Sequence, residues 1–452
     1  MTTPPAVQEA PAVAGVAAGD NGRFAAGFAA RPDLLDAPPR LVDFRRQALA
    51  ALAETPFPTR RDEDWRYSDF TRALREDWSL ASVATPQFAR ADFEIPDFRG
   101  HVLVTVDGAY RPDLSDEVPD CEVLALEDAF AREPYAFWLD RVVAELHAPS
   151  SNAFVQANGA FAAGGLVLAP ARNTRVAKPI HVVHVATRAQ QPRMVSSQVF
   201  AILTTGAELT VDETFHVVGD AAGAPLFRNH LVRAGLAPQA RLAYRSLQTE
   251  ELRDYHHSNT EVDQQAGSYF DHARIDFGGA QVRNNLSAVH KAEGLETYFA
   301  GAYFARGTQR IDNQTFVDHA FPHGESNELY KGIAMERAVT SFNGKVVVRP
   351  DAQKTNAFQQ NDNLVIGTKA EANAKPQLEI FADDVKCSHG ATIGQMDEAP
   401  LYYLMARGIP RGRALAMLQR GFLLEVFERI ESDAIRAHVE RLLEAKFNVE
   451  AS

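Results

Sequence analysis

The sequence predicts a mainly β protein with a repetitive β core, a mixed N-terminal domain and a helical C-terminal domain. Short extended runs bounded by turn residues recur between about residues 152 and 385. A small residue followed by alternating apolar residues also recurs, at spacings of roughly 26 to 33 residues that are typical of repeat architectures. Helical patterns between these runs are scarce, which argues against a doubly wound α/β sheet. The clearest runs are GLVLAP (165–170), PIHVVHVAT (179–187), SQVFAILT (197–204) and GKVVVRP (344–350), and the repeated starts are Ala207, Ala240 and Ala266.

Two architectures fit this core, a large β-sandwich and a parallel β-helix. Both alternate apolar and polar residues, but the near-regular repeat length favours the β-helix, in which each coil stacks on the last. Roughly nine coils at about 4.8 Å each would form a rod about 43 Å long. Such a rod exposes strand edges at its ends, and we expect the flanking helical segments to cover them.

Changes of pattern divide the chain into four segments. We expect residues 1–22 to be a disordered tail, because this Ala/Pro/Gly-rich stretch offers little to bury and resembles neither a secretory signal nor an Arg-rich transit peptide. Residues 23–150 are expected to form a mixed helical domain with a strand at 101–108. The β core is assigned to residues 151–386 and the helical domain to residues 387–452.

The N-terminal domain contains an acidic and aromatic cluster, Glu63-Asp64-Trp65-Arg66-Tyr67. Two interpretations are open for it. The favoured one is a helix start whose aromatic side chains anchor the domain, and the other is a docking site for a partner.

The C-terminal segment carries three apolar stripes at helical spacing, with a stop at Gly408 and Pro410 and a cap at Ser432 or Asp433. Three short amphipathic helices are too few to form much of a core. We therefore expect them to pack on the β core, on a partner or on both, either as an end cap or as a binding surface. The stripes are Leu401, Leu404 and Met405; Leu415, Leu418, Phe422, Val426 and Ile430; and Ile435, Val439, Leu442 and Leu443.

Composition excludes several classes of protein. The hydrophobic fraction of 46% is ordinary for a globular chain of 452 residues, and no run approaches the roughly 18 apolar residues that a membrane helix needs. The net charge of −13 argues against a nucleic-acid surface. Two cysteines form no disulfide framework, so we expect a reducing, cytoplasmic compartment.

Cys387 and His389 are the strongest candidates for chemistry. If their segment is extended, the two side chains project from the same face, as a soft metal-ligand pair or a nucleophile and its base. A self-contained zinc or iron–sulfur site usually needs four ligands, and Cys121 is far away in the sequence. Metal chemistry at this pair therefore requires ligands from a second polypeptide. The alternative is that Cys387 is only a small buried apolar residue.

Other motifs are absent or ambiguous. Gly344-Lys345 is followed by Val346, so no P-loop is present and we expect no ATP hydrolysis by this chain. The polar cluster from Asp312 to Glu325 could bind a divalent ion or act on a saccharide, but a polar ladder and a loop are favoured. In Tyr255-His256-His257, the adjacent histidines of a strand would face opposite ways.

Several segments between about Thr297 and Ile430 resemble the SufB/SufD scaffold family of the Suf iron–sulfur cluster assembly system. The most specific is DDVKCSHGATIGQ, which is followed by a helical D-E-x-x-L-Y-Y-L-x-x-R-G. The Glu63–Tyr67 cluster is also similar to an N-terminal signature of the family. The CSHGAT form at 387–392, without the additional cysteines typical of SufB, resembles the SufD branch. The other segments are GTQRIDNQTFVDHAFPH (307–323), ESNELYKGIAMERAVTSFNGKVVV (325–348), DAQKTNAFQQNDNLVIG (351–367) and KPQLEIFADDVKCSHGATIGQMDEAPLYYLMARGI (375–409).

The resemblance implies a right-handed parallel β-helix core with a helical domain at each end. It also implies a non-enzymatic scaffold that pairs with a SufB-type subunit, with Cys387 and His389 at the interface where a nascent iron–sulfur cluster is built. A reduced flavin has been associated with the family's complex, but no flavin motif occurs here. SufC-type ATPase subunits are expected to bind the C-terminal helices, for which the candidate docking residues are Leu401, Leu404, Met405, Leu415, Leu418 and Phe422.

Two other functions compete with this hypothesis. The first is a β-helix carbohydrate enzyme that uses the Asp312–Glu325 cluster, although the expected lack of a secretory signal counts against it. The second is a purely structural partner subunit in which Cys387 is inert. A Cys387 sulfur deep inside the apolar interior, away from any surface, would rule out the cluster-assembly role.

Overall fold

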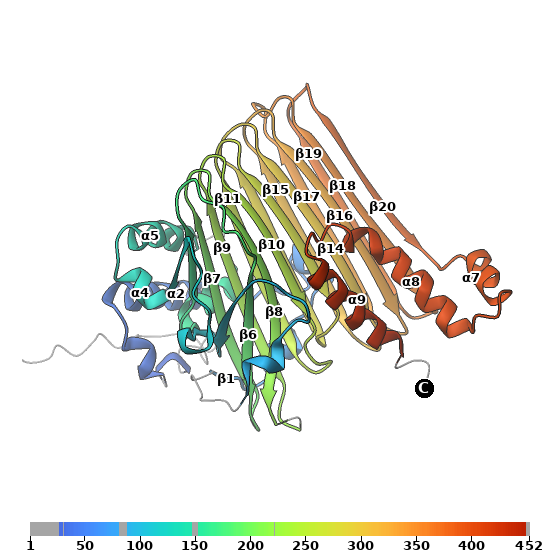
Figure 1. Ribbon diagram of the computed structural model, residues 1–452, viewed down its shortest axis with the longest axis horizontal. Helices are drawn as coiled ribbons and strands as arrows, with labels where there is room; N and C mark the ends of the chain where they lie inside the picture. Colours follow the sequence, from blue (N-terminus) through green and yellow to red (C-terminus); the bar gives the residue numbers. More distant parts are fainter. Residues whose placement is uncertain (1–26, 30, 81–87, 147–151, 221, 449–452) are drawn as a thin grey trace, which may run out of the picture.

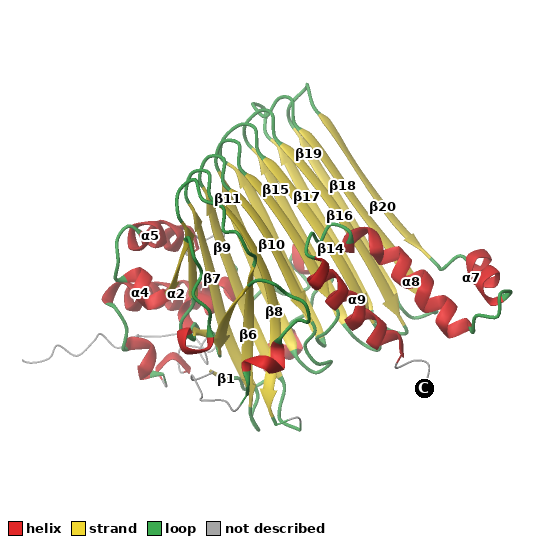
Figure 2. Cartoon of the chain, in the orientation of Figure 1, coloured by secondary structure: helices red, strands yellow, loops and turns green. Residues whose placement is uncertain are grey.

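The computed structural model describes residues 27–29, 31–80, 88–146, 152–220 and 222–448 (Figure 1). Its described part is a parallel β-solenoid of about eight turns with helices at both ends (Figure 2). This confirms the mainly β fold and the β-helix rather than the sandwich. Residues 1–26 lie outside the described residues, and so does the tail expected at 1–22.

Each turn of the solenoid contributes one strand to each of two sheets, and successive turns pair in parallel. Sheet A contains β4 (Cys121–Ala125), β5 (Leu166–Pro170), β7 (Arg193–Leu203), β9 (Leu226–Leu236), β11 (Tyr255–Gln264), β13 (Gln281–His290), β15 (Arg310–His319), β17 (Val339–Val348) and β19 (Glu371–Ile380), with β1 (Ser79–Leu80) beside β7. Sheet B contains β3 (Ala109–Tyr110), β2 (His101–Val106), β6 (Ile180–Arg188), β8 (Glu208–Gly219), β10 (Arg241–Gln248), β12 (Tyr269–Asp276), β14 (Glu296–Ala305), β16 (Glu325–Met335), β18 (Asn356–Ile366) and β20 (Lys386–Gly394).

The repeated starts seen in the sequence mark successive turns of sheet B. Leu209 pairs with Leu242, and Leu242 pairs with Phe270, so all three face the interior in one column. Side chains alternate between the two faces of a strand, and in-register pairing therefore stacks like positions over each other. The apolar part of the interior is built from such columns.

The first turns of the solenoid are covered. At that end β4 pairs antiparallel with β5, β2 extends sheet B, and helices cover the outer face of sheet A (Figure 1). These helices are α2 (Pro39–Glu54), α3 (Thr71–Arg75), α4 (Leu126–Phe130), α5 (Tyr135–Leu146) and α6 (Ala153–Phe161).

The Glu63–Tyr67 cluster contributes to this cover. Trp65 is buried, stacks on Phe154 with ring centroids 5.3 Å apart, and has the Arg283 guanidinium 4.1 Å from its ring. Arg283 also donates a hydrogen bond to the main-chain oxygen of Asp64 at 2.8 Å. The cluster thus anchors the N-terminal segment to sheet A, as the favoured interpretation predicted, although its helix is only the short turn Glu63–Trp65.

The C-terminal helices cover the outer face of sheet B. The covering helices are α8 (Arg411–Phe427) and α9 (Asp433–Asn448), and α7 (Glu398–Met405) precedes them. Leu423, Val426 and Phe427 of α8 are buried against outward-facing residues of β12, β14 and β16, and α9 adds Val439 and Leu443. These two helices therefore pack on the β core, while α7 reaches past β20 (Figure 1). No described helix has both the length and the apolar character to span a membrane.

The last turn of the solenoid is open. Among the described residues, β19 has only β17 as its neighbour in sheet A, and β20 has only β18 in sheet B. β20 also continues to Gly394, past the domain boundary expected at residue 386, and the following helix begins at Glu398. The two ends of the rod therefore differ, because helices and antiparallel strands cover one of them and the other ends in strand edges.

Candidate functional site

Cys387 and His389 lie on β20, the last strand of sheet B. In the register Cys387 pairs with Ala357, and His389 pairs with Gln359. Both side chains belong to the inward face, because Ala357 and Gln359 are buried inward-facing residues of β18. The expectation that the two residues share one face of an extended segment is confirmed.

The thiol of Cys387 is half-buried at the end of an interior column. It packs against the apolar core on the β18 side, and the described chain places no strand on its other side. Burial raises the pKa of this thiol, although a backbone hydrogen bond from Ala357 partly offsets the effect. The thiol of the lone chain is therefore protonated at neutral pH and is a poor metal ligand until a cation or a partner stabilises the thiolate.

The imidazole of His389 is exposed at the same open turn. Within the described chain, no third histidine, cysteine or carboxylate joins it and Cys387 to make a three-ligand group. The described chain thus offers two potential ligands at this turn, and the sequence-based hypothesis that a second polypeptide supplies the others stays a prediction. The position of the pair at the open end leaves room for ligands from another polypeptide.

A polar layer lies directly beneath His389. Gln359 pairs with Glu328 of the next turn, and both side chains are buried. Burial raises the pKa of Glu328 to about 7, and a hydrogen bond from the Thr315 hydroxyl limits the rise. A carboxyl group that titrates near neutrality thus lies two strands, or roughly 10 Å, below the exposed imidazole.

Asparagine and tyrosine side chains extend this layer across the last turns. The Tyr303 hydroxyl donates to Asn363 Oδ1 at 2.8 Å, and Asn361 Nδ2 donates to the same hydroxyl at 3.0 Å. Asn363 Nδ2 donates to Asn361 Oδ1 at 2.7 Å. These hydrogen bonds give the buried polar groups of Tyr303, Asn361 and Asn363 partners and hold the side chains of the layer beneath the last turn in place.

The candidate ATPase-docking residues differ in how much of each side chain is exposed for contact with a partner. Leu401 is buried, whereas the other five are half-buried. The most exposed apolar residues of these helices are Tyr402, Tyr403 and Met417. Met417 lines a groove of about 600 Å³ between α8 and α9, together with Gly412, Arg413, Ala416, Arg420, Glu444 and Phe447.

The Asp312–Glu325 cluster does not form an acid–base pair. Asp312 is buried on the outer face of β15, where it pairs with Arg283 and accepts a hydrogen bond from Ser341 at 2.6 Å. His319 faces the interior, with its Nε2 2.8 Å from Ser326 Oγ, while Glu325 is exposed beside Tyr298. The favoured polar ladder is what the structure contains.

The adjacent histidines of β11 face opposite ways, as expected. His256 Nδ1 lies 2.8 Å from Glu250 inside the solenoid, whereas His257 stacks on Phe154 outside it. Both imidazoles are thus engaged in contacts within the chain.

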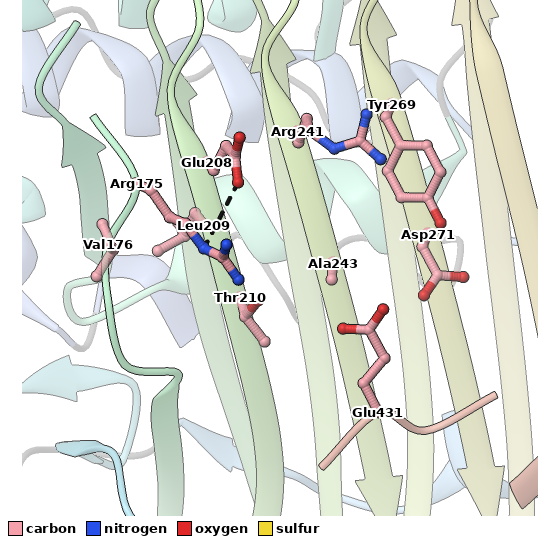
Figure 3. A pocket seen from close by; sticks show the side chains of 10 residues that line it. All are labelled: Arg175, Val176, Glu208, Leu209, Thr210, Arg241, Ala243, Tyr269, Asp271 and Glu431. Atoms are coloured by element: carbon pink, nitrogen blue, oxygen red, sulfur yellow. Dashed lines mark ion pairs between the residues drawn. The ribbon is translucent and has the colours of Figure 1, made fainter. Parts of the chain in front are cut away.

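A polar hollow of about 260 Å³ lies on the outer face of sheet B (Figure 3). Arg175 and Arg241 lie along its rim, and Glu208, Asp271 and Glu431 bring the opposite charge. Arg175 pairs with Glu208 at 3.7 Å, and the Arg241 guanidinium covers the Tyr269 ring at 4.1 Å. These charges largely balance, so the hollow does not select for an anionic ligand.

Sequence reasoning missed one cluster of metal-ligating side chains. His184, Glu213 and His230 bring three potential ligand atoms within 4.8 Å of one another in the interior. They belong to three different strands, and only the stacking of turns brings them together. No spacing within a single segment could have indicated this cluster.

Comparison with known proteins finds family models that match most of the chain. Residues 28–182 match the model of the SufBD protein N-terminal region, and residues 184–422 match the SufBD core domain of SUF system FeS cluster assembly. An iron–sulfur cluster assembly SufBD family protein of Synechocystis is 28% identical over 90% of this chain and 91% of its own length. The SufD protein of Escherichia coli is 29% identical over 87% of this chain and 90% of its own length. The chloroplastic protein ABCI7 of Arabidopsis thaliana is 29% identical over 89% of this chain and 86% of its own length.

Replacing Glu328 with glutamine should change how stability depends on pH. The folded-state pKa of about 7 exceeds the ordinary value of 4.5, so the folded chain binds more protons between these two values. Ionisation of Glu328 therefore lowers wild-type stability as pH rises from about 4.5 to 7, by roughly 3 kcal/mol in total. The Glu328→Gln variant lacks this loss. The free energy of unfolding of the variant minus that of wild type should therefore be larger at pH 8 than at pH 5.

Urea unfolding at both pH values measures this difference. Glu325→Gln, an exposed change on the same strand, is the matched control and should follow wild type. Equal pH dependence in wild type and Glu328→Gln would refute the buried, titrating carboxyl.

Proposed function

The chain belongs to the SufBD family of iron–sulfur cluster assembly proteins, and we propose that it is a SufD-like scaffold subunit whose cluster site is completed by a SufB-like partner. One observation carries the proposal. A cysteine and a histidine face inward on the last turn of the solenoid, where the described chain leaves one side of the turn uncovered. The assembling cluster is cargo rather than a resident cofactor, and we assign no catalytic activity to this chain.

The open turn has the character of a surface that another subunit covers. Ile380, Phe381 and Ile393 expose 41%, 61% and 52% of their surface there. Unpaired edges of β19 and β20 lie beside them, and exposed edges invite pairing with another chain. A paralogue with a similar open turn would cover these apolar residues and bring its own ligands to Cys387 and His389.

Pairing would also change the chemistry of the two side chains. The Cys387 thiol has a raised pKa in the lone chain, so sulfur ligation is disfavoured there. A nearby iron ion or a cationic group of the partner would stabilise the thiolate. His389 then acts as an imidazole ligand or orients the neighbouring thiolate. This dependence on the partner keeps the half-site inactive until the complex has formed.

Nucleotide hydrolysis is assigned to a separate SufC-like subunit. The groove between α8 and α9 is the proposed contact, since Met417 is exposed and Arg413 and Arg420 flank it. α8 rests on β14 and β16, so movement of this helix would be transmitted to the last turns of the solenoid. We place the assembly in the cytoplasm, because both cysteines are free thiols, and assign no flavin to this chain.

Alanine at position 389 should lower cluster formation at least several-fold in the reconstituted complex. The substitution removes an imidazole from an exposed position, so the fold and the pairing of subunits should be retained. Anaerobic iron and sulfide analysis of the purified complex measures the yield. Ser388→Ala, a change on the opposite face of the same strand, is the matched control and should leave the yield unchanged. An unchanged yield in His389→Ala would leave only a structural role for this site.

The two proposed contacts should be separable by single substitutions. Ile393→Asp places a charge on the open turn and should weaken binding of the SufB-like subunit about tenfold or more, while the ATPase still binds. Met417→Asp should have the reverse effect. Co-purification with each candidate partner distinguishes the two variants. Phe137→Asp, at an apolar residue of α5 that is 63% exposed, is the control and should retain both partners. Loss of both partners, or of neither, in the two test variants would contradict the assignment.

A further inference from the structure

A second cluster of metal-ligating groups lies deep in the solenoid, among its first turns. His184 of β6 and Glu213 of β8 come from sheet B, and His230 of β9 comes from sheet A. The side chains of all three are about 1% exposed. The cluster therefore connects the two sheets across the interior, remote in the fold from the open turn that carries Cys387.

The donor atoms converge on one carboxylate oxygen. Glu213 Oε1 lies 2.8 Å from His184 Nε2, 2.6 Å from His230 Nε2 and 3.0 Å from the Tyr244 hydroxyl, which donates to it. Glu213 Oε2 has no hydrogen-bond partner, and His230 Nε2 is not aligned for a hydrogen bond despite its short distance. A buried network held by hydrogen bonds alone would use both oxygens, whereas this one leaves a buried lone pair on each of two ligand residues.

The outer nitrogens of both imidazoles are held by hydroxyl groups. His184 Nδ1 lies 2.7 Å from Thr105 Oγ1, and His230 Nδ1 lies 2.8 Å from Ser197 Oγ. A hydroxyl oxygen can accept from an Nδ1–H, which leaves the Nε2 lone pair facing Glu213. This is the outer-shell arrangement that fixes the tautomer of metal-ligating histidines.

The charges around the cluster also leave the carboxylate without a dedicated cation. Arg228 pairs with Glu250 at 2.6 Å, and Arg274 pairs with Asp276 at 2.9 Å. Within the described chain, the ion pairs of Glu213 are with His184 and His230, and no arginine or lysine forms an ion pair with it. A buried negative charge without an arginine or lysine partner is costly, and a divalent ion would neutralise it.

We propose that His184, Glu213 and His230 form a buried site for a divalent first-row transition-metal ion, best matched by Zn²⁺. Two imidazoles and one carboxylate are a ligand set that suits Zn²⁺ and Fe²⁺. Metal–ligand bonds of about 2.0–2.2 Å separate ligand atoms by roughly 3 to 3.5 Å, so each histidine Nε2 needs to move away from Glu213 Oε1 by less than about 1 Å. Glu213 supplies one carboxylate oxygen as the third ligand. The ion would join β6, β8 and β9 and stabilise the first turns of the solenoid.

The test is metal-loaded refolding of the full chain, because the folded interior gives an ion no open route. The chain is unfolded with a chelator, refolded with Co²⁺ as a spectroscopic substitute for Zn²⁺, and freed of unbound ion. We expect about one Co²⁺ per chain, with visible absorption typical of nitrogen and oxygen ligands and no sulfur-to-metal band. Native circular dichroism with less than about a tenth of an ion per chain would overturn the proposal.

Three variants locate the ion. Glu213→Gln should lose it, and Ser197→Ala, which removes only a supporting hydroxyl, should weaken binding about tenfold to a hundredfold. The double variant Cys387→Ser with His389→Ala should keep the full stoichiometry, which separates this site from the proposed cluster site. Full binding by Glu213→Gln, or loss of the ion in the double variant, would contradict the assignment.

Discussion

In-register stacking of parallel turns is the constraint on which the rest of the structure depends. Each residue sits over its equivalent in the next turn, so a side chain that points inward once requires compatible inward neighbours along the whole column. The column through Leu209, Leu242 and Phe270 continues through β14, β16 and β18 and ends at Cys387. The last member of such a column has a partner on one side only. The chemistry proposed for Cys387 therefore follows from its position at the end of a stack.

The same stacking explains how the interior holds many charged groups. Arginines inside the solenoid meet carboxylates either of a neighbouring turn, as Arg228 does with Glu250, or of their own strand, as Arg274 does with Asp276. Truncating one member of such a pair would leave a buried charge, so a pair between turns, such as Arg228 with Glu250, fixes the register of those turns. Glu213 and Glu328 differ from these carboxylates because neither has an arginine or lysine in an ion pair within the described structure.

The sequence predicted the features that repeat and missed those that depend on stacking or orientation. Spacing of Ala207, Ala240 and Ala266 predicted the parallel coil, and the two-residue spacing of Cys387 and His389 predicted their common face. The sequence pattern did not indicate strand β20, because this Gly- and Ser-containing strand is exposed and lacks an apolar run. The boundary was therefore predicted at the start of the strand rather than after it. Helical spacing identified Val426 of α8 but missed Leu423 and Phe427, which also face the sheet. It gave no indication that Met417 faces outward. His184, Glu213 and His230 meet only after folding.

The reactivity of the two thiols tests the central claim most directly, namely that another subunit completes the open turn. Cys387 is half-buried at the edge, whereas Cys121 is buried and has a pKa raised by burial to about 12, so it serves as an internal control. An alkylating reagent should label Cys387 in the lone native chain, leave Cys121 unlabelled, and lose access to Cys387 once the SufB-like subunit is bound. Labelling of Cys387 at the same rate in the lone chain and in the complex would contradict the account.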